Sequence, residues 1–300
     1  MTSSSENIRG AVLMAACMGA FATNDALMRS VAGELPVSQA IFLRGAVACI
    51  LLLVILLVTR RSLPLPGRDA RRTILVRSAA EAGTGTAVVV ALNHMPLAVF
   101  SAVGQAAPLS VTLAGALFLR EPIGWRRLTA IFAGFLGVLV IIRPGTDGFS
   151  AWSLVALLAV AFLTLRDLAS RQIPAAIPPT IPAFCGALAT TAMAVLWGCF
   201  VDWQPVPPRV LAVLAVAGVS LVLAYLLAIQ SMRAGELSFV APFRYTGLLW
   251  AISIGVIFLG EGLDIYTVTG SAIVVAAGGY SLWREIRLRR LQARPVIPRP

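Results

Sequence analysis

The chain has 300 residues, of which 59% are hydrophobic and only 12% are charged, and its mean hydropathy is +0.89. A soluble globule of this size needs more polar residues to cover its surface, so the composition predicts an integral membrane protein. The net charge of +11 comes from 24 arginines without a single lysine. Because the arginines follow loop positions, this charge does not indicate nucleic-acid binding.

Ten apolar runs follow one another along the chain, and each approaches the roughly twenty residues that an α-helix needs to cross a bilayer. The spans are expected near residues 10–28, 38–58, 74–93, 97–119, 125–142, 151–170, 180–200, 210–231, 237–259 and 265–283. The first run is too long for a secretory signal peptide. No run alternates as a β-barrel strand would. The sequence therefore predicts an all-α membrane protein with ten transmembrane helices.

The distribution of arginines predicts the orientation in the membrane. With the N-terminus inside, eighteen arginines lie on the inner side, whereas the outer loops contain only Arg29, Arg143 and Arg209. The remaining three arginines fall within the spans. Because positive charge accumulates on the cytoplasmic side of a membrane, both termini are expected in the cytoplasm. We expect a multi-pass protein of the bacterial inner membrane.

A stretch of the chain occurs twice. Val99–Glu121 and Phe239–Glu261 are apolar runs that both end in Phe-Leu-x-Glu, about 140 residues apart, which indicates two copies of a half-length unit. The first span of each half also ends in an acid and a base one turn apart, Asp25 with Arg29 and Asp167 with Arg171. Five spans per half is an odd number, so the second copy must enter the membrane from the opposite side. The repeat is therefore expected to be inverted.

The expected boundaries follow from this repeat. Residues 1–145 form the first five-helix unit, residues 146–285 form the second, and residues 286–300 form a basic cytoplasmic tail that is read as an anchor against anionic lipid. Inverted repeats are typical of transporters, which bind substrate near the middle of the membrane between the two halves.

A motif at the end of each repeat resembles the ten-helix EamA-type branch of the drug/metabolite transporter superfamily. In this motif a proline or its replacement, Pro108 and Leu248, stands thirteen residues before a glutamate. The stretches Phe42–Arg44 and Pro242–Tyr245 are also similar to members of this group. The resemblance covers nearly the whole chain. It implies a carrier that exports amino acids and other small metabolites, or that takes up metabolites such as S-adenosylmethionine.

Charged groups inside the spans are the first candidates for a pathway, because a charge in lipid needs a partner or a wet cavity. Asp25 and Arg44 are expected at similar depth near the outer side, and Glu81 and Arg244 at similar depth near the inner side. Each pair is either a gate or a structural lock. Arg77, one helical turn before Glu81, competes as its partner.

Aromatic residues and prolines complete the candidate site. Substrate contacts are expected from Arg44, Glu81 and Arg244 together with five aromatic residues, Phe100, Tyr225, Phe243, Tyr245 and Trp250. The prolines expected to bend the fourth and ninth spans are Pro96, Pro108 and Pro242. We expect these two spans to line the cavity with the first, third, sixth and eighth, and the fifth and tenth to stand outside.

Two glutamates, Glu121 and Glu261, follow helix C-terminal ends, where the helix dipole is unfavourable to an anion. We interpret them as caps of neighbouring backbone amides, or as partners of Arg126 and Arg127, in preference to a role in proton coupling.

The sequence contains no nucleotide-binding loop, no metal-ligand cluster and no nucleophile beside a base, so an enzyme and a primary pump are not expected. No metal or cofactor is expected, and the expected partners are a small-molecule substrate and the lipid bilayer. The oligomeric state is open, with a monomer compatible with the sequence.

Three hypotheses remain: an exporter of small polar metabolites, with amino acids as the first choice; an uptake carrier for a metabolite such as S-adenosylmethionine; and a membrane structural or receptor protein without transport.

Overall fold

The computed structural model describes residues 4–59, 67–118, 124–145, 150–174, 176–234 and 237–292. The first half contains α1 (Ser4–Ser30), α2 (Val37–Val58), α3 (Arg68–His94), α4 (Leu97–Gly104), α5 (Ala107–Phe118) and α6 (Trp125–Ile142). The second half contains α7 (Trp152–Arg171), α8 (Thr180–Gly198), α9 (Pro208–Ala234), α10 (Leu237–Val240), η1 (Ala241–Tyr245), α11 (Thr246–Leu259) and α12 (Ile265–Gln292). Within these described ranges the fold is all-helical, as the sequence predicts.

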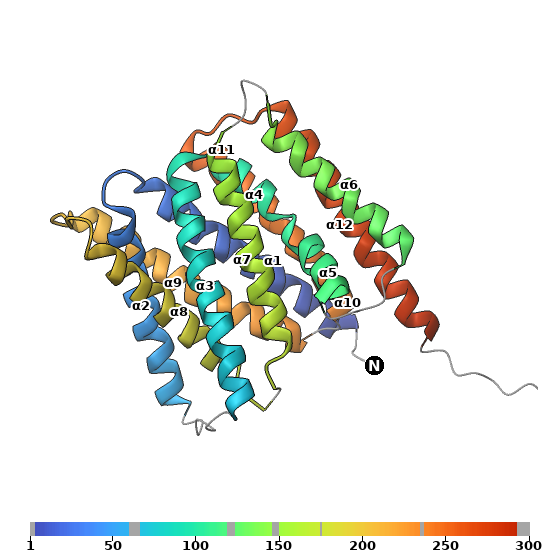
Figure 1. Cartoon of the computed structure of the whole chain (residues 1–300), viewed down its shortest axis with the longest axis horizontal. Helices are drawn as coiled ribbons and strands as arrows, with labels where there is room; N and C mark the ends of the chain where they lie inside the picture. The colour runs from blue at the N-terminus through green and yellow to red at the C-terminus, as the bar shows by residue number, and fades with distance from the viewer. Residues whose placement is uncertain are drawn as a thin grey trace, which may run out of the picture.

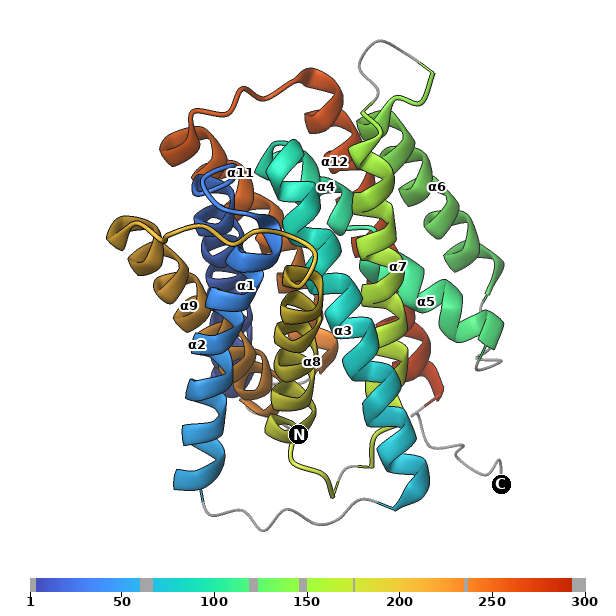
Figure 2. The same ribbon diagram turned by 60° about the vertical axis from the view of Figure 1, so that its left-hand side comes forward.

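These helices form ten spans, because α4 with α5 and α10 with η1 and α11 each make one interrupted crossing. In the described part of the chain, nine segments are long and apolar enough to cross a membrane, and α6 contributes a shorter apolar helix, Leu128–Ile142. The predicted count of ten is confirmed. The start of α1 and the end of α12 lie at the same end of the bundle (Figure 2).

The helix contacts follow a two-fold rule that relates the halves. The first span, α1, packs on the eighth, α9, and the equivalent pair, α3 with α7, packs in the same way. Likewise α1 contacts α11, and its counterpart α7 contacts α4 and α5. In two further pairs, α2 with α8 and α6 with α12, each helix packs on its own equivalent from the other half. Since equivalent helices run in opposite directions (Figure 2), the two five-helix repeats are inverted.

These two pairs of equivalent helices, α2 with α8 and α6 with α12, lie on either side of the charged groups described below. Helices α6 and α12 run side by side at one edge of the molecule (Figure 1). Gly134 and Gly137 of α6 and Gly270 of α12 allow this close approach, because a Cβ at any of them would meet atoms of a neighbouring helix.

The fourth and ninth spans are interrupted where prolines remove backbone donors. In the fourth span, α4 ends at Gly104 and α5 begins at Ala107, with Pro108 in its first turn. Pro108 has no N–H to donate to the carbonyl four residues earlier, which favours the break. In the ninth span, Pro242 lies in the 3₁₀ segment η1. Pro96, which was expected to bend a helix, instead precedes α4 and occupies its N-cap position.

Candidate transport site: buried charges between the two halves

Glu81 lies halfway along α3 and is only 7% exposed. The hydroxyl of Tyr225, on α9, donates a hydrogen bond of 2.8 Å to Glu81 Oε1. Arg77 Nη2 lies 3.4 Å from Glu81 Oε2, and Arg166 Nη1 lies 3.5 Å from Oε1. This carboxylate therefore joins α3, α7 and α9, with the two arginines balancing its charge in a region from which water is largely excluded.

A second carboxylate, Asp167 on α7, extends the cluster towards the ninth span. Arg166 donates to Asp167 Oδ1 through Nε at 3.0 Å and through Nη2 at 2.8 Å. Arg244 Nη2, in η1, lies 3.7 Å from Asp167 Oδ2. The expected partnership of Arg244 with Glu81 is therefore wrong: Arg244 pairs with Asp167, while Glu81 is held by Arg77, Arg166 and Tyr225. The suggested competition from Arg77 for Glu81 agrees with this arrangement.

Arg77 is also fixed at its far side. Its Nε donates to Ser170 Oγ at 3.1 Å, and its Nη1 donates to the carbonyl oxygen of Pro182 on α8 at 2.5 Å. Gly186 of α8 makes room for these groups, since a Cβ there would lie 2.9 Å from Glu81 Cγ and 3.0 Å from Arg77 Nη1. Because Gly186 has no side chain, the polar side chains of Glu81 and Arg77 fit between these helices.

The cluster formed by Arg77, Glu81, Arg166, Asp167 and Arg244, called the inner cluster below, holds more positive than negative charge. Three guanidinium groups face two carboxylates. The side chains of Arg77 and Arg166 are 11% and 17% exposed, whereas that of Arg244 is 38% exposed. The surplus cation is therefore best able to accept an anionic group at Arg244, the most accessible of the three.

A second polar group, called the outer cluster, consists of Asn24, Asp25 and Arg44. Arg44 is 5% exposed, and its Nη1 donates to Asn24 Oδ1 at 3.4 Å, while Asn24 Nδ2 donates to Asp25 Oδ1 at 2.8 Å. Asp25 and Arg44 therefore come close, as expected, but the amide of Asn24 links them in place of a direct ion pair. The Nε of Arg44 has no hydrogen-bond partner among the described residues.

Arg44 also lies near the inner cluster, because a Cβ at Gly85, one helical turn after Glu81 in α3, would lie 3.9 Å from Arg44 Nη2. A row of polar groups thus runs through the contacts between the halves, from Asp25 near the C-terminal end of α1 to Arg244 in η1. It draws on the first, second, third, sixth, eighth and ninth spans.

The candidate aromatic residues have different surroundings. Tyr225 belongs to the charged row and also meets Phe21 edge-on, with ring centroids 5.8 Å apart. Phe243 lies beside Arg244 in η1 and contacts Phe239, with centroids 6.0 Å apart. Tyr245, on the other side of Arg244 in η1, also lies next to the charged row.

Three of the aromatic candidates contact neighbouring helices. Phe100 is 8% exposed and belongs to the apolar core. Trp250 donates its indole N–H to the carbonyl oxygen of Ala15 at 3.0 Å and covers Gly19 of α1. The hydroxyl of Tyr245 is directed at Gly278 of α12, where a Cβ would collide with it.

Glu261 lies apart from the charged row and caps a helix. Its Oε1 accepts a 2.8 Å hydrogen bond from the backbone N–H of Leu97, and its Oε2 accepts one of 3.3 Å from Ala98. Arg29 Nε lies 3.6 Å from Oε1. A carboxylate at the N-terminus of α4 is favoured by the free amides and by the helix dipole. This agrees with the capping interpretation, whereas Glu121 lies outside the described residues.

Sequence reasoning missed the roles of Asn24, Arg166 and Asp167. Arg166 and Asp167 were assigned to the end of the sixth span, although an adjacent base and acid within an apolar run are a signal of a buried pair. Because α7 packs along the longer helix α3, these side chains face its middle.

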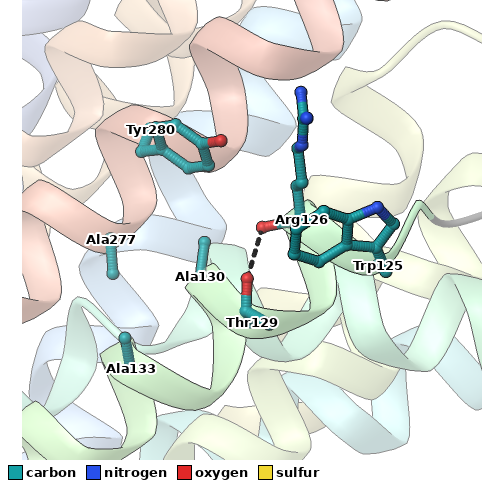
Figure 3. A pocket seen from close by; sticks show the side chains of 7 residues that line it. All are labelled: Trp125, Arg126, Thr129, Ala130, Ala133, Ala277 and Tyr280. Carbon is teal, nitrogen blue, oxygen red and sulfur yellow. Dashed lines mark hydrogen bonds between the residues drawn. The ribbon is translucent and has the colours of Figure 1, made fainter.

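A shallow groove of about 480 Å³ lies between α6 and α12, away from the charged row (Figure 3). It is lined by Trp125, Arg126, Thr129, Ala130, Ala133, Ala277 and Tyr280. Small side chains of Ala130, Ala133 and Ala277 lie in the middle of this lining (Figure 3). Its place on the outer pair of helices sets it apart from the contacts between the halves.

Known proteins similar to this chain are carriers of metabolites. A pseudopaline exporter of Pseudomonas aeruginosa is 27% identical over 271 residues, which cover 89% of this chain and 94% of the exporter. A riboflavin transporter of Brucella anthropi is 28% identical, with 75% of this chain and 84% of the relative covered. An S-adenosylmethionine uptake transporter of Rickettsia prowazekii is 25% identical over 65% of this chain and 66% of that protein.

The fold is also known from experiment. A solved crystal structure superposes with a TM-score of 0.65 at 18% identity, covering 93% of this chain and 98% of the other. The profile of the EamA-like transporter family matches twice, at residues 8–143 and 150–279, once in each half. This multi-pass membrane protein, built from two inverted five-helix repeats, is therefore a metabolite transporter and not an enzyme, and it belongs to the EamA-like transporter family.

Proposed function

We propose that this chain exports small polar metabolites, with amino acids as the main class, across the bacterial inner membrane by alternating access. Residues 1–145 and 146–285 move against each other around the charged row, and residues 286–300 form a basic cytoplasmic tail. Both termini face the cytoplasm, because eighteen of the arginines then lie on the inner side.

The observation that carries this proposal is the surplus guanidinium group of the inner cluster. Arg244 lies in η1, where the ninth span is interrupted, and its contact with Asp167 at 3.7 Å is longer than either contact between Arg166 and Asp167. A guanidinium can exchange one carboxylate for another because its N–H groups match both oxygens of either. The carboxylate of an amino acid would thus bind Arg244, with Phe243 beside its side chain.

The direction of transport is supported by the pseudopaline exporter, which matches over nearly its full length. Uptake of S-adenosylmethionine is the second candidate, because relatives that carry this name match two thirds of the chain. The surplus of arginines favours the first candidate, since the sulfonium cation of S-adenosylmethionine would be repelled by an uncompensated guanidinium.

Flux into proteoliposomes tests the proposal. Purified protein is reconstituted into liposomes, and the liposomes are loaded with a radiolabelled mixture of the proteinogenic amino acids. Exchange of this label is then measured against single amino acids and against S-adenosylmethionine. Exchange of amino acids supports the proposal, and exchange of S-adenosylmethionine alone supports the second candidate. If neither amino acids nor S-adenosylmethionine are exchanged, the protein lacks this transport activity and both candidate functions are refuted.

Arg244→Gln is the variant that links flux to the site. Losing a charge-assisted hydrogen bond costs about 1.5–3 kcal/mol, so flux at low substrate concentration should fall about tenfold or more. Arg209→Gln is the matched control, because Arg209 is an exposed arginine that pairs with Glu34 at 2.9 Å, and its flux should stay within about twofold of the wild type.

A further inference from the structure

The charged row holds more arginines than carboxylates over its whole length. In the described part of the chain, its ionisable acids and bases are Arg44, Arg77, Arg166, Arg244, Asp25, Glu81 and Asp167. The ion pair of Arg29 with Glu261 lies apart from the row and is balanced in itself. With all these acids and bases ionised, the row carries one positive charge in excess, in a region where an unbalanced charge is costly.

Two of the four arginines have their donors occupied by the protein. Arg166 contacts both Asp167 and Glu81. Arg77 contacts Glu81 and donates two further hydrogen bonds to groups on α7 and α8. The other two arginines of the row are held less completely, so they are the ones that can take up an added anion.

Arg44 is the more deeply buried of these two. It is 5% exposed, and its Nη1 donates to the amide oxygen of Asn24 at 3.4 Å. Among the described residues its Nε has no hydrogen-bond partner, and no carboxylate oxygen lies within 4.0 Å of its guanidinium nitrogens. A buried guanidinium group with a spare donor and no carboxylate beside it is suited to bind an anionic group of a ligand.

Arg244 is the second arginine with donors to spare. Its side chain is 38% exposed, and its ion pair with Asp167 is 3.7 Å long. If that contact opens, Asp167 keeps its two hydrogen bonds from Arg166. The row thus offers two guanidinium groups, one on α2 and one in η1, to the anionic groups of a cargo.

The charge of the cargo decides what remains unbalanced when the site is loaded. An amino acid with a neutral side chain brings one carboxylate and one ammonium group, so the positive excess of the row persists. An amino acid with a second carboxylate carries one net negative charge at neutral pH, and the loaded row is then neutral. Because opposite charges attract most strongly where water is excluded, this second class has the advantage inside the membrane.

We propose that the preferred cargo of this chain is an amino acid with a second carboxylate, such as glutamate or aspartate, and that Arg44 and Arg244 select it over its neutral amide. The inference rests on the proposed function, because it narrows the class of amino acids that the same site carries. It gives Arg44, in the second span, a role in specificity beside that of Arg244.

Matched substrates isolate the effect of the charge. Glutamate and glutamine, and likewise aspartate and asparagine, are nearly equal in size and differ in a carboxylate against an amide. Each is measured as a single labelled substrate in the proteoliposome exchange assay, at pH 7 on both sides, where the side-chain carboxylates are ionised. The kcat/KM for each acid should exceed that for its amide about tenfold or more, the effect of one charge-assisted hydrogen bond.

Variants at the two arginines test where the preference arises. Arg44→Gln and Arg244→Gln each remove the excess charge and should lower the ratio of acid to amide exchange about tenfold. Arg44→Lys and Arg244→Lys retain the charge and should keep a preference for the acid, although the loss of the guanidinium geometry lowers the total flux. An arginine with a purely structural role would affect acid and amide alike, so the ratio separates the two roles.

The matched control is Arg209→Gln, at an exposed arginine outside the row. This substitution also removes one positive charge, but the charge lies in water, where its effect on a buried ligand is screened. The ratio of acid to amide exchange should therefore stay at the wild-type value.

Binding provides a measurement that does not require transport. Glutamate should raise the thermal unfolding midpoint of the purified protein in detergent at concentrations where glutamine has little effect, because a ligand that binds only the folded state stabilises it. The Arg44→Gln and Arg244→Gln proteins should lose this difference. Cooperative unfolding identifies the variants that keep the fold, and either Gln variant alone decides the ratio.

The outcomes keep the two proposals apart. Equal exchange of acid and amide, or faster exchange of the amide, would overturn the preference and leave amino-acid transport standing. A wild-type ratio in the folded Gln variants would also overturn it, and would indicate that an inorganic anion from solution balances the row. Absence of any amino-acid exchange would instead refute the function on which the preference rests.

Discussion

Arg166 and Arg244 both contact Asp167, but they are held differently. Arg166 also reaches Glu81 at 3.5 Å, and its side chain is 17% exposed, whereas the Arg244 side chain is 38% exposed and makes one ion pair at 3.7 Å. Truncating Arg166 would leave two buried carboxylates short of positive charge. Truncating Arg244 would leave Asp167 with its two hydrogen bonds from Arg166. We therefore expect Arg166 to stabilise the fold, and we propose Arg244 as the arginine available to a substrate.

We predict that substitution of Arg166 mainly lowers stability, whereas substitution of Arg244 mainly lowers flux. Arg166→Gln should lower the free energy of unfolding by about 3–5 kcal/mol, the usual cost of breaking a buried ion pair, and should reduce the yield of folded protein. Arg244→Gln should lower it by about 1 kcal/mol or less while reducing flux. Thermal unfolding and proteoliposome flux, measured on the same preparations, check both effects; equal stability losses would contradict the assignment.

At the scale of helices, the interrupted ninth span is tied to the outer pair of helices by Tyr245. Its hydroxyl fits against Gly278 of α12, and the neighbouring residue in η1 is Arg244. A side chain at Gly278 would therefore push η1 away from α12 and displace the arginine. Gly278 of α12 therefore influences the position of Arg244, a candidate substrate contact.

Gly278→Ala tests this connection, and Gly279→Ala is its control in the same helix turn. The first substitution should destabilise the protein by about 1–3 kcal/mol through overpacking and lower flux. A Cβ at Gly279 would have no atom within 4 Å, so the second substitution should be neutral or should stabilise by up to about 1 kcal/mol. Replacing Tyr245 by Leu in the Gly278→Ala protein should restore part of the stability, and no recovery would argue against the contact.

For the whole molecule, the inverted repeat places equivalent loops at opposite ends. Two ion pairs that join the halves, Arg209 with Glu34 and Arg143 with Asp264, lie at the same end of the bundle, where α1 and α6 end and α9 and α12 begin. The charged row lies deeper along the helices and also connects the halves. The two-fold relation of the helix contacts implies that a movement which opens one end can be mirrored at the other, which is the requirement for alternating access.

Single cysteines in a chain without its four native cysteines should report this arrangement. A membrane-impermeant maleimide added to intact cells should label cysteines at Glu34, Asp202 and Gly262, and added to inverted vesicles it should label those at Gly67 and Gln172. All five positions are exposed. Labelling of Gly67 from outside would overturn the proposed orientation, and labelling of Glu34 and Gln172 from the same side would contradict the inverted repeat.

Several features of the fold could be derived from the sequence. Span length and hydropathy are local properties, so the ten crossings were predictable. The odd number of spans in each copy of the Phe-Leu-x-Glu repeat required inversion. Glu261 could be interpreted as a cap of another helix. It follows the C-terminal end of its own helix, where the helix dipole is unfavourable to an anion. The domain boundary at residue 145 and the cytoplasmic location of the termini remain predictions.

The partners of the buried charges depended on the tertiary structure. Depth can be counted along a span, and it placed Glu81 level with Arg244, but a one-residue change turns a side chain by about 100° around the helix axis. Which helix that side chain then faces depends on the rotation and tilt of every neighbour. Packing of α7 along α3 brings Arg166 to Glu81 and leaves Asp167 for Arg244. The sequence by itself determined which charges enter the membrane and roughly how deep they lie, and only the packing of the helices decided which of them meet.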